Sequence, residues 1–179
     1  MKKFEFTDET KQNEGGITLH RIRAIRDFGD VKAGDLGGWI EREGNLSQSS
    51  DCWIYDDAQV YGSAQVFEDA RVFGNAAVFD DAQVYGNAVV SGNAAVCEDA
   101  NVYGNAKISG NAAVFGNAAV YGDAQVYGSA LVFEDARVFD NARVFDNAAA
   151  YDNAAVYGDA EISGDRWICD SAQIYDNAR

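Results

Sequence analysis

The chain has 179 residues, no proline, and a formal net charge of −15. A charge this negative argues against binding to DNA, RNA or an anionic membrane surface, because like charges repel. No apolar run approaches the ~18 residues that span a bilayer, and Met1-Lys2-Lys3 is not followed by the apolar stretch of a signal peptide, so we expect a cytoplasmic protein.

Residues 1–51 predict an N-terminal β-hairpin cap and an entry into the next domain. Residues 4–6 and 17–26 alternate between apolar and polar side chains, as strands do, and the turn-like segment 13–16 separates them. Phe4 and Phe6, with Leu19 or Ile17, are expected to cover the open end of the following repeat domain. Repeat domains need such a cap, because an exposed strand edge invites aggregation.

The same segment contains the only cluster of basic residues in the chain. With two nearby tryptophans, this cluster is a candidate site for a small anionic ligand such as a nucleotide. The candidate residues are His20, Arg21, Arg23, Arg26, Lys32, Trp39 and Trp53. The alternative is that the basic side chains form ion pairs with the neighbouring Asp and Glu residues and that His20 is structural.

Residues 52–179 repeat a pattern of six residues. Alanine recurs at every sixth position from Ala58 to Ala160, and Val or Ile follows two positions later, except at Ala150. This spacing is not helical; two residues that are two apart lie on the same side of an extended strand. Gly-Asn, Gly-Asp and Asp-Asn pairs then supply a turn, since these residues tolerate positive φ.

Each six-residue unit is therefore predicted to be one short strand and one corner. Three corners close a triangular coil, so the fold class is all-β, a single-stranded parallel β-helix with about 18 residues per coil and about seven coils. The alanine and valine columns would form its continuous core. Cys52, Cys97 and Cys169 are too widely spaced to predict a disulfide framework.

The repeats also resemble a known family. Val-Tyr-Gly-Asn-Ala, Val-Phe-Gly-Asn-Ala and Val-Tyr-Gly-Asp-Ala, with the leader segment 34–40 (Gly-Asp-Leu-Gly-Gly-Trp-Ile), are similar to the hexapeptide-repeat, left-handed β-helix superfamily. The closest likeness is to YdcK-type β-solenoid repeats of bacterial and prophage proteins, over residues ~28–179. Left-handed winding is implied by this resemblance alone, because strand crossovers are otherwise right-handed.

The resemblance implies enzymatic chemistry that the residues do not supply. Acyltransferases of this superfamily use a catalytic histidine, and its anhydrase-like members hold zinc with three histidines. Residues 52–179 contain no histidine, and His20 is the only one in the chain. We therefore assign no catalytic residue, metal ligand or cofactor and expect a binding or scaffolding protein that is not an enzyme. An acyltransferase that uses a histidine from elsewhere is the less favoured alternative.

Every third repeat shares a face, and one face predicts self-association. Its strand centres are nearly uncharged and flat: Gln59, Ala77, Ala95, Ala113, Leu131, Ala149 and Trp167. A second copy could pack on the last six of these, so a homo-oligomer is expected. Rings follow the strands in columns, and the unbroken column lies on another face: Phe67, Tyr85, Tyr103, Tyr121, Phe139, Tyr157 and Tyr175. Such stacked rings are read either as a stabilising ladder or as a self-association or ligand surface.

The corner beside this face is an acidic ridge. It includes Asp80-Asp81 and Glu98-Asp99. Paired carboxylates at the corners, such as Asp56-Asp57 and Asp80-Asp81, are expected to be solvated. The ridge either keeps the protein in solution or attracts a basic protein partner. A further alternative is a bacterial or phage protein that sequesters a nucleotide signal or interferes with a host factor.

Overall fold

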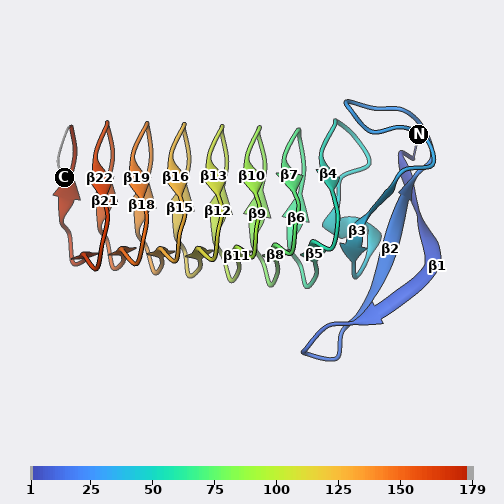
Figure 1. Ribbon diagram of the computed structural model, residues 1–179, viewed down its shortest axis with the longest axis horizontal. Helices are drawn as coiled ribbons and strands as arrows, with labels where there is room; N and C mark the ends of the chain where they lie inside the picture. Colours follow the sequence, from blue (N-terminus) through green and yellow to red (C-terminus); the bar gives the residue numbers. More distant parts are fainter. Residues whose placement is uncertain (1, 177–179) are drawn as a thin grey trace.

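The computed structural model describes residues 2–176, which form an N-terminal hairpin and a parallel β-solenoid of about 18 residues per turn and about eight turns (Figure 1). The predicted all-β parallel coil is confirmed. It has more turns than the seven predicted, because β3 (Leu36–Ile40) already pairs in parallel with β5 (Gln59–Val60). Within residues 2–176, no helix is long and apolar enough to cross a membrane.

Three sheets make the sides of the solenoid, and we name each after its first two-residue strand. The β5 face continues β1, β2 and β3 in one sheet. Its strands are β1 (Phe4–Gln12), β2 (Thr18–Ala24), β3, β5, β8 (Ala77–Val78), β11 (Ala95–Val96), β14 (Ala113–Val114), β17 (Leu131–Val132), β20 (Ala149–Ala150) and β23 (Trp167–Ile168). The chain visits each face in turn, so a strand pairs with the strand 18 residues away.

The other two faces contain two-residue strands only. The β4 face consists of β4 (Trp53–Ile54), β7 (Arg71–Val72), β10 (Val89–Val90), β13 (Lys107–Ile108), β16 (Gln125–Val126), β19 (Arg143–Val144) and β22 (Glu161–Ile162). The β6 face consists of β6 (Gln65–Val66), β9 (Gln83–Val84), β12 (Asn101–Val102), β15 (Ala119–Val120), β18 (Arg137–Val138), β21 (Ala155–Val156) and β24 (Gln173–Ile174), and a short 3-10 helix, η1 (Glu43–Asn45), lies before β4.

The core is the pair of columns that the sequence predicts. Ala100 and Val102 are fully buried, and the repeat positions equivalent to them are buried from Ala58 to Ile162, whereas those of the last described turn are half-buried or, at Arg166, exposed. The residue between them, Asn101, faces outward and is half-buried. Each turn thus places alanine and valine side chains inward from all three faces, and the narrow interior leaves little room for anything larger.

The corners depend on a left-handed backbone conformation. Gly104 has a φ of +71°, and a Cβ there would lie 2.9 Å from the backbone nitrogen of Gly122. Acidic residues take the same conformation at other corners, as Asp140 does with a φ of +59°. Glycine suits this position because it has no side chain to collide with the next turn.

The acidic corner residues are exposed, yet they bind the next turn. The Asp56 carboxylate accepts a hydrogen bond from the backbone N–H of Gly74 at 3.1 Å, and the Glu98 carboxylate accepts one from Gly116 at 2.9 Å. The same contact recurs 18 residues apart for Glu68, Glu134, Asp140, Asp146 and Asp152. The corner carboxylates Asp56, Asp57, Asp80 and Asp81 are exposed to solvent, as expected. What the sequence did not predict is that Asp56 and Glu98 also accept a hydrogen bond, because the turn leaves an N–H that a carboxylate 18 residues earlier can reach.

The N-terminal hairpin closes one end of the core. Phe4 and Ile22 are fully buried and join the cluster that continues into the solenoid, and Phe6 packs against its edge. Gly37 lets β3 approach closely, since a Cβ at this position would lie 2.6 Å from both the Ile22 and Trp53 side chains. In Figure 1 the hairpin extends beyond the solenoid on the side of the β5 face.

Candidate functional site

The structure brings together two members of the predicted anion-binding cluster, Arg21 and Trp39. The two residues pair across β2 and β3, and the Arg21 guanidinium lies 5.2 Å from the Trp39 ring centre. The Lys11 ammonium lies on the same ring at 4.4 Å, and burial lowers the pKa of Lys11 below its ordinary value. The sequence analysis missed Lys11, although a hairpin that pairs Lys11 with Leu19 places it two residues from Arg21 across the strand.

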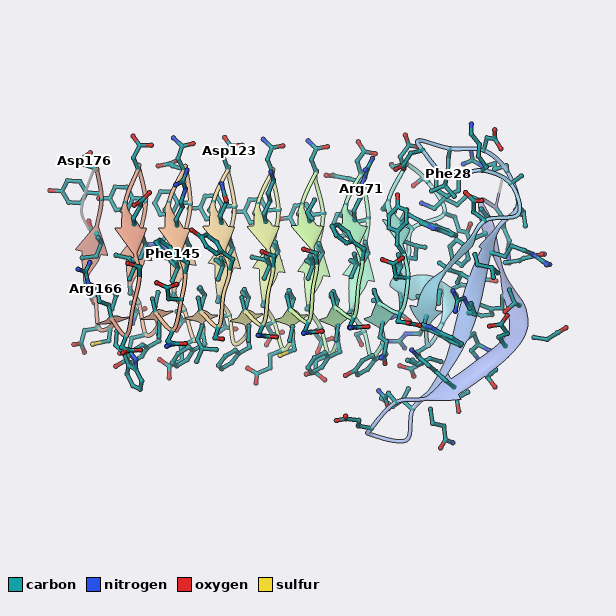
Figure 2. All side chains as sticks on the ribbon, viewed as in Figure 1. Phe28, Arg71, Asp123, Phe145, Arg166 and Asp176 are labelled. Atoms are coloured by element: carbon teal, nitrogen blue, oxygen red, sulfur yellow. The ribbon has the colours of Figure 1, made fainter. Side chains whose placement is uncertain are left out.

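Of the other basic residues of the cluster, Arg26 and Lys32 both donate to Asp27, the first to its carbonyl oxygen and the second to its carboxylate, whereas Arg23 has a different partner. Arg23 forms an ion pair with Glu5 at 2.6 Å, and Lys32 forms one with Asp27 at 3.1 Å. Arg26 lies 5.7 Å from the ring of Phe28, a residue that Figure 2 labels in the N-terminal part. The structure therefore does not gather Arg23, Arg26 and Lys32 around one point.

The two remaining residues of the cluster make aromatic contacts. The His20 ring is half-buried and stacks on Phe6, with ring centres 4.8 Å apart. Trp53 is 1% exposed and packs edge-to-face on Phe4 and Phe28, at 6.3 and 5.3 Å between ring centres. Trp53 thus lies in the core, away from the outer side of Trp39.

The tip of the hairpin and the β5 face enclose a groove of about 410 Å3. Residues 11–15 form one wall, and Gln59, Tyr61 and Ala77 form the other. The groove has both a cation, Lys11, and an acid, Glu14, so its lining is not specific for anions. It lies at the hairpin end of the predicted self-association face.

The β5 face has the properties expected of a contact surface. From β5 to β23, no described strand centre on this face carries a charge. Leu131 is 37% exposed and Trp167 is 68% exposed, which is high for large apolar side chains. By contrast, the strand centres of the other two faces include Arg71, Lys107, Arg137, Arg143 and Glu161.

A column of stacked rings runs beside this row. Tyr61 and Phe79 stack with ring centres 5.0 Å apart, and Phe115, Phe133 and Tyr151 stack in sequence at 4.9 Å. The spacing equals the rise of one turn, so each ring lies on its neighbour, as the sequence predicts. The rings make the edge of the β5 face apolar.

Cys97 interrupts this column. Its side chain is half-buried, and burial raises the pKa of the thiol to about 11, with a further contribution from Glu98. At neutral pH the side chain is therefore mostly the thiol, and only a minor fraction is the nucleophilic thiolate.

One further group of polar side chains was not foreseen. Asp152, Cys169 and Asp170 place one ligand atom each within 4.8 Å of one another, although no metal ligand was assigned from the sequence. The 18-residue spacing of the two aspartates is the signal for this grouping. The Asp152 carboxylate already accepts a hydrogen bond from the backbone N–H of Asp170 at 3.0 Å, which is a structural role.

Comparison with known proteins supports the repeat assignment. A family model described as a YdcK beta solenoid repeat matches residues 82–98. "Uncharacterized acetyltransferase YdcK" of Escherichia coli (strain K12) is 42% identical over 74 residues, which cover 37% of this chain and 23% of that protein. The chain thus spans less than a quarter of that relative. The predicted resemblance to YdcK-type β-solenoid repeats is confirmed.

The same comparison corrects one expectation. We expected from the missing solenoid histidines that the chain is not an enzyme, and this is wrong as stated, because the relative is named as an acetyltransferase. That expectation considered only the histidines that the resemblance assigns to catalysis. It could not address groups outside that pattern.

Proposed function

We propose that this chain is a binding and scaffolding solenoid that associates with a second copy of itself through the β5 face. The observation that carries the proposal is the uncharged centre row with its exposed Leu131 and Trp167. Residues 52–179 hold 6 basic and 19 acidic residues, so an uncharged side is unusual in this solenoid. Exposed apolar surface of this kind marks contact sites.

The size of the face is sufficient for a specific contact. Six coils at ~4.8 Å and a width of ~16 Å give roughly 500 Å2 per copy, or on the order of 1,000 Å2 for a face-to-face pair. Trp167 and Leu131 supply the large side chains on which such interfaces depend, and the alanines between them allow close approach.

Because the solenoid is acidic, the salt dependence of binding distinguishes a second copy of the chain from a basic protein partner. Two copies repel each other through their acidic corners, and salt screens this repulsion over a Debye length of ~10 Å at 0.1 M. Self-association through the β5 face therefore strengthens as salt is added. Binding of a basic partner to the acidic ridge weakens under the same change.

The test compares two alanines of the same turn by sedimentation velocity. Ala113 and Ala119 are both half-buried strand centres, but Ala113 lies on the β5 face and Ala119 on the β6 face. We expect Ala113→Arg to raise the dissociation constant by about 100-fold, because it buries an unpaired charge, and Ala119→Arg to leave it unchanged. A protein that stays monomeric at all concentrations and salt levels, or equal effects of the two changes, would contradict the proposal.

A second candidate function is acetyl transfer, which the name of the relative favours. Such chemistry needs a group that accepts the proton of the attacking substrate, and histidine serves this role most often. His20, half-buried against Phe6, is the residue of this chain with that capacity.

The test for this candidate is release of free coenzyme A from acetyl-coenzyme A in the presence of amine acceptors. We expect release by the unchanged protein and a fall of at least about 100-fold with His20→Ala. His20→Phe keeps a ring against Phe6 and separates loss of the base from loss of packing. No release by the unchanged protein, or full activity of His20→Ala, would remove this candidate.

A further inference from the structure

Lys3 and Cys52 form a buried pair that the sequence analysis did not predict. Neither residue has any exposed surface. The Lys3 Nζ lies 3.1 Å from the Cys52 Sγ and donates to the carbonyl oxygens of Cys52 at 2.7 Å and Ser50 at 3.2 Å. None of the ion pairs among residues 2–176 includes Lys3.

Burial acts against the charged form of each member of the pair. Burial lowers the pKa of Lys3 below its ordinary value, although Cys52 opposes this shift. Burial raises the pKa of the Cys52 thiol, although Lys3 opposes that shift. When the Lys3 amine gives up its extra proton, its free electron pair lies 3.1 Å from the Cys52 sulfur.

We propose that Lys3 and Cys52 are a site of oxidative modification, at which hydrogen peroxide converts the pair into a covalent S–N crosslink, a sulfenamide. The inference is independent of self-association through the β5 face. The crosslink would join the residue that precedes β1 to the residue that precedes β4, and it would fix the hairpin to the first turn of the solenoid.

The chemistry balances with one peroxide. The Cys52 thiol passes its proton to the Lys3 amine, the thiolate attacks one peroxide oxygen, and the O–O bond breaks. The departing hydroxide takes that proton from Lys3 and leaves as water, so that sulfur is oxidised by two electrons to a sulfenic acid and peroxide is reduced. The Lys3 nitrogen then attacks the sulfur, the S–O bond breaks, and the hydroxide leaves as water with a proton from the amine. The sum is one thiol, one amine and one peroxide giving one sulfenamide and two waters.

The experiment must allow for the access of peroxide to Cys52 and for oxidation of the other two cysteines. Cys97 and Cys169 are half-buried and would oxidise as well, so both are first replaced by serine. Peroxide is about the size of two water molecules and reaches Cys52 during local opening, whereas a bulky alkylating reagent is excluded until the protein is denatured.

The test is the intact mass of the Cys97→Ser, Cys169→Ser protein after treatment with peroxide. We expect a loss of ~2 Da, return to the starting mass with a thiol reductant, and a fragment that links the peptides of Lys3 and Cys52. Gains of ~16 or ~32 Da alone, a gain of ~14 Da from an oxygen-bridged link, or no change in mass would each overturn the proposal.

Two variants test whether Lys3 supplies the nitrogen and Cys52 the sulfur of the crosslink. Lys3→Arg keeps a cation with hydrogen-bond donors but lacks the amine, so oxidation should stop at the sulfenic or sulfinic acid. Cys52→Ser should show no change in mass. A loss of ~2 Da that persists in Lys3→Arg would identify a backbone amide as the nitrogen and would refute the role of Lys3. The result for the unchanged pair remains decisive if Lys3→Arg does not fold.

Discussion

Replacing Ala118 with leucine is expected to lower the free energy of unfolding by about 3 kcal/mol, whereas the same change at Ala119 alters it by less than about 0.5 kcal/mol. Ala118 is fully buried and points into the interior, while the next residue points outward from β15 and is half-buried. A larger side chain inside must displace the alanine and valine columns of three faces at once, because the backbone of each turn is fixed by the turns on both sides.

The measurement is a urea titration followed by circular dichroism of the two variants and the unchanged protein. Ala119→Leu is the matched control, since it changes the same residue type to the same size at the next position of the chain. A loss of stability at Ala119 that equals the loss at Ala118 would mean that the two residues do not differ in environment, and the inward position of the alanine column would be wrong.

The corners give the second large expected effect. Gly104→Val should cost about 3 kcal/mol, because a β-branched residue is strained at a φ of +71° and its Cβ would lie 2.9 Å from the nitrogen of Gly122. Gly104→Asp has the same Cβ but should cost less than Gly104→Val, by about 1–2 kcal/mol, because Asp tolerates this conformation better than a β-branched residue. Asp140 adopts a φ of +59° at the equivalent corner, and its carboxylate accepts the N–H of Gly158 at 3.3 Å.

These two variants have a Cβ in common and differ in β-branching and in the presence of a carboxylate. Thermal and urea unfolding of both give the comparison, and a third variant, Gly104→Asn, tests the charge, since its amide oxygen can accept the same hydrogen bond. If Gly104→Asp is as unstable as Gly104→Val, the hydrogen bond from carboxylate to the next turn does not offset the strain, and the corner account fails.

The repeat domain could be predicted almost residue by residue because a single spacing determines it. Once alanine and valine point inward at Ala100 and Val102, every position six residues away has the same orientation. The placement of the uncharged row on one side follows directly, since strands 18 residues apart share a face. No contact between distant parts of the chain has to be known.

The N-terminal segment could be predicted only in outline, because its packing depends on distant contacts. Trp39 and Trp53 are close in the sequence but lie on different faces, the first beneath Lys11 and Arg21 and the second beneath Phe4 and Phe28. The burial of Lys3 depends on the loop before β4 folding over it. A hairpin pattern alone does not specify which loop that is.

Because each turn contacts only the residues 18 positions before and after it, the chain can change length by whole turns. Duplication of an 18-residue block would preserve every corner hydrogen bond. It would lengthen the uncharged row of the β5 face without altering its direction. An insertion of a single six-residue unit would instead rotate all later repeats by one third of a turn. The uncharged row would then continue on a neighbouring face and be divided into two shorter, non-aligned patches.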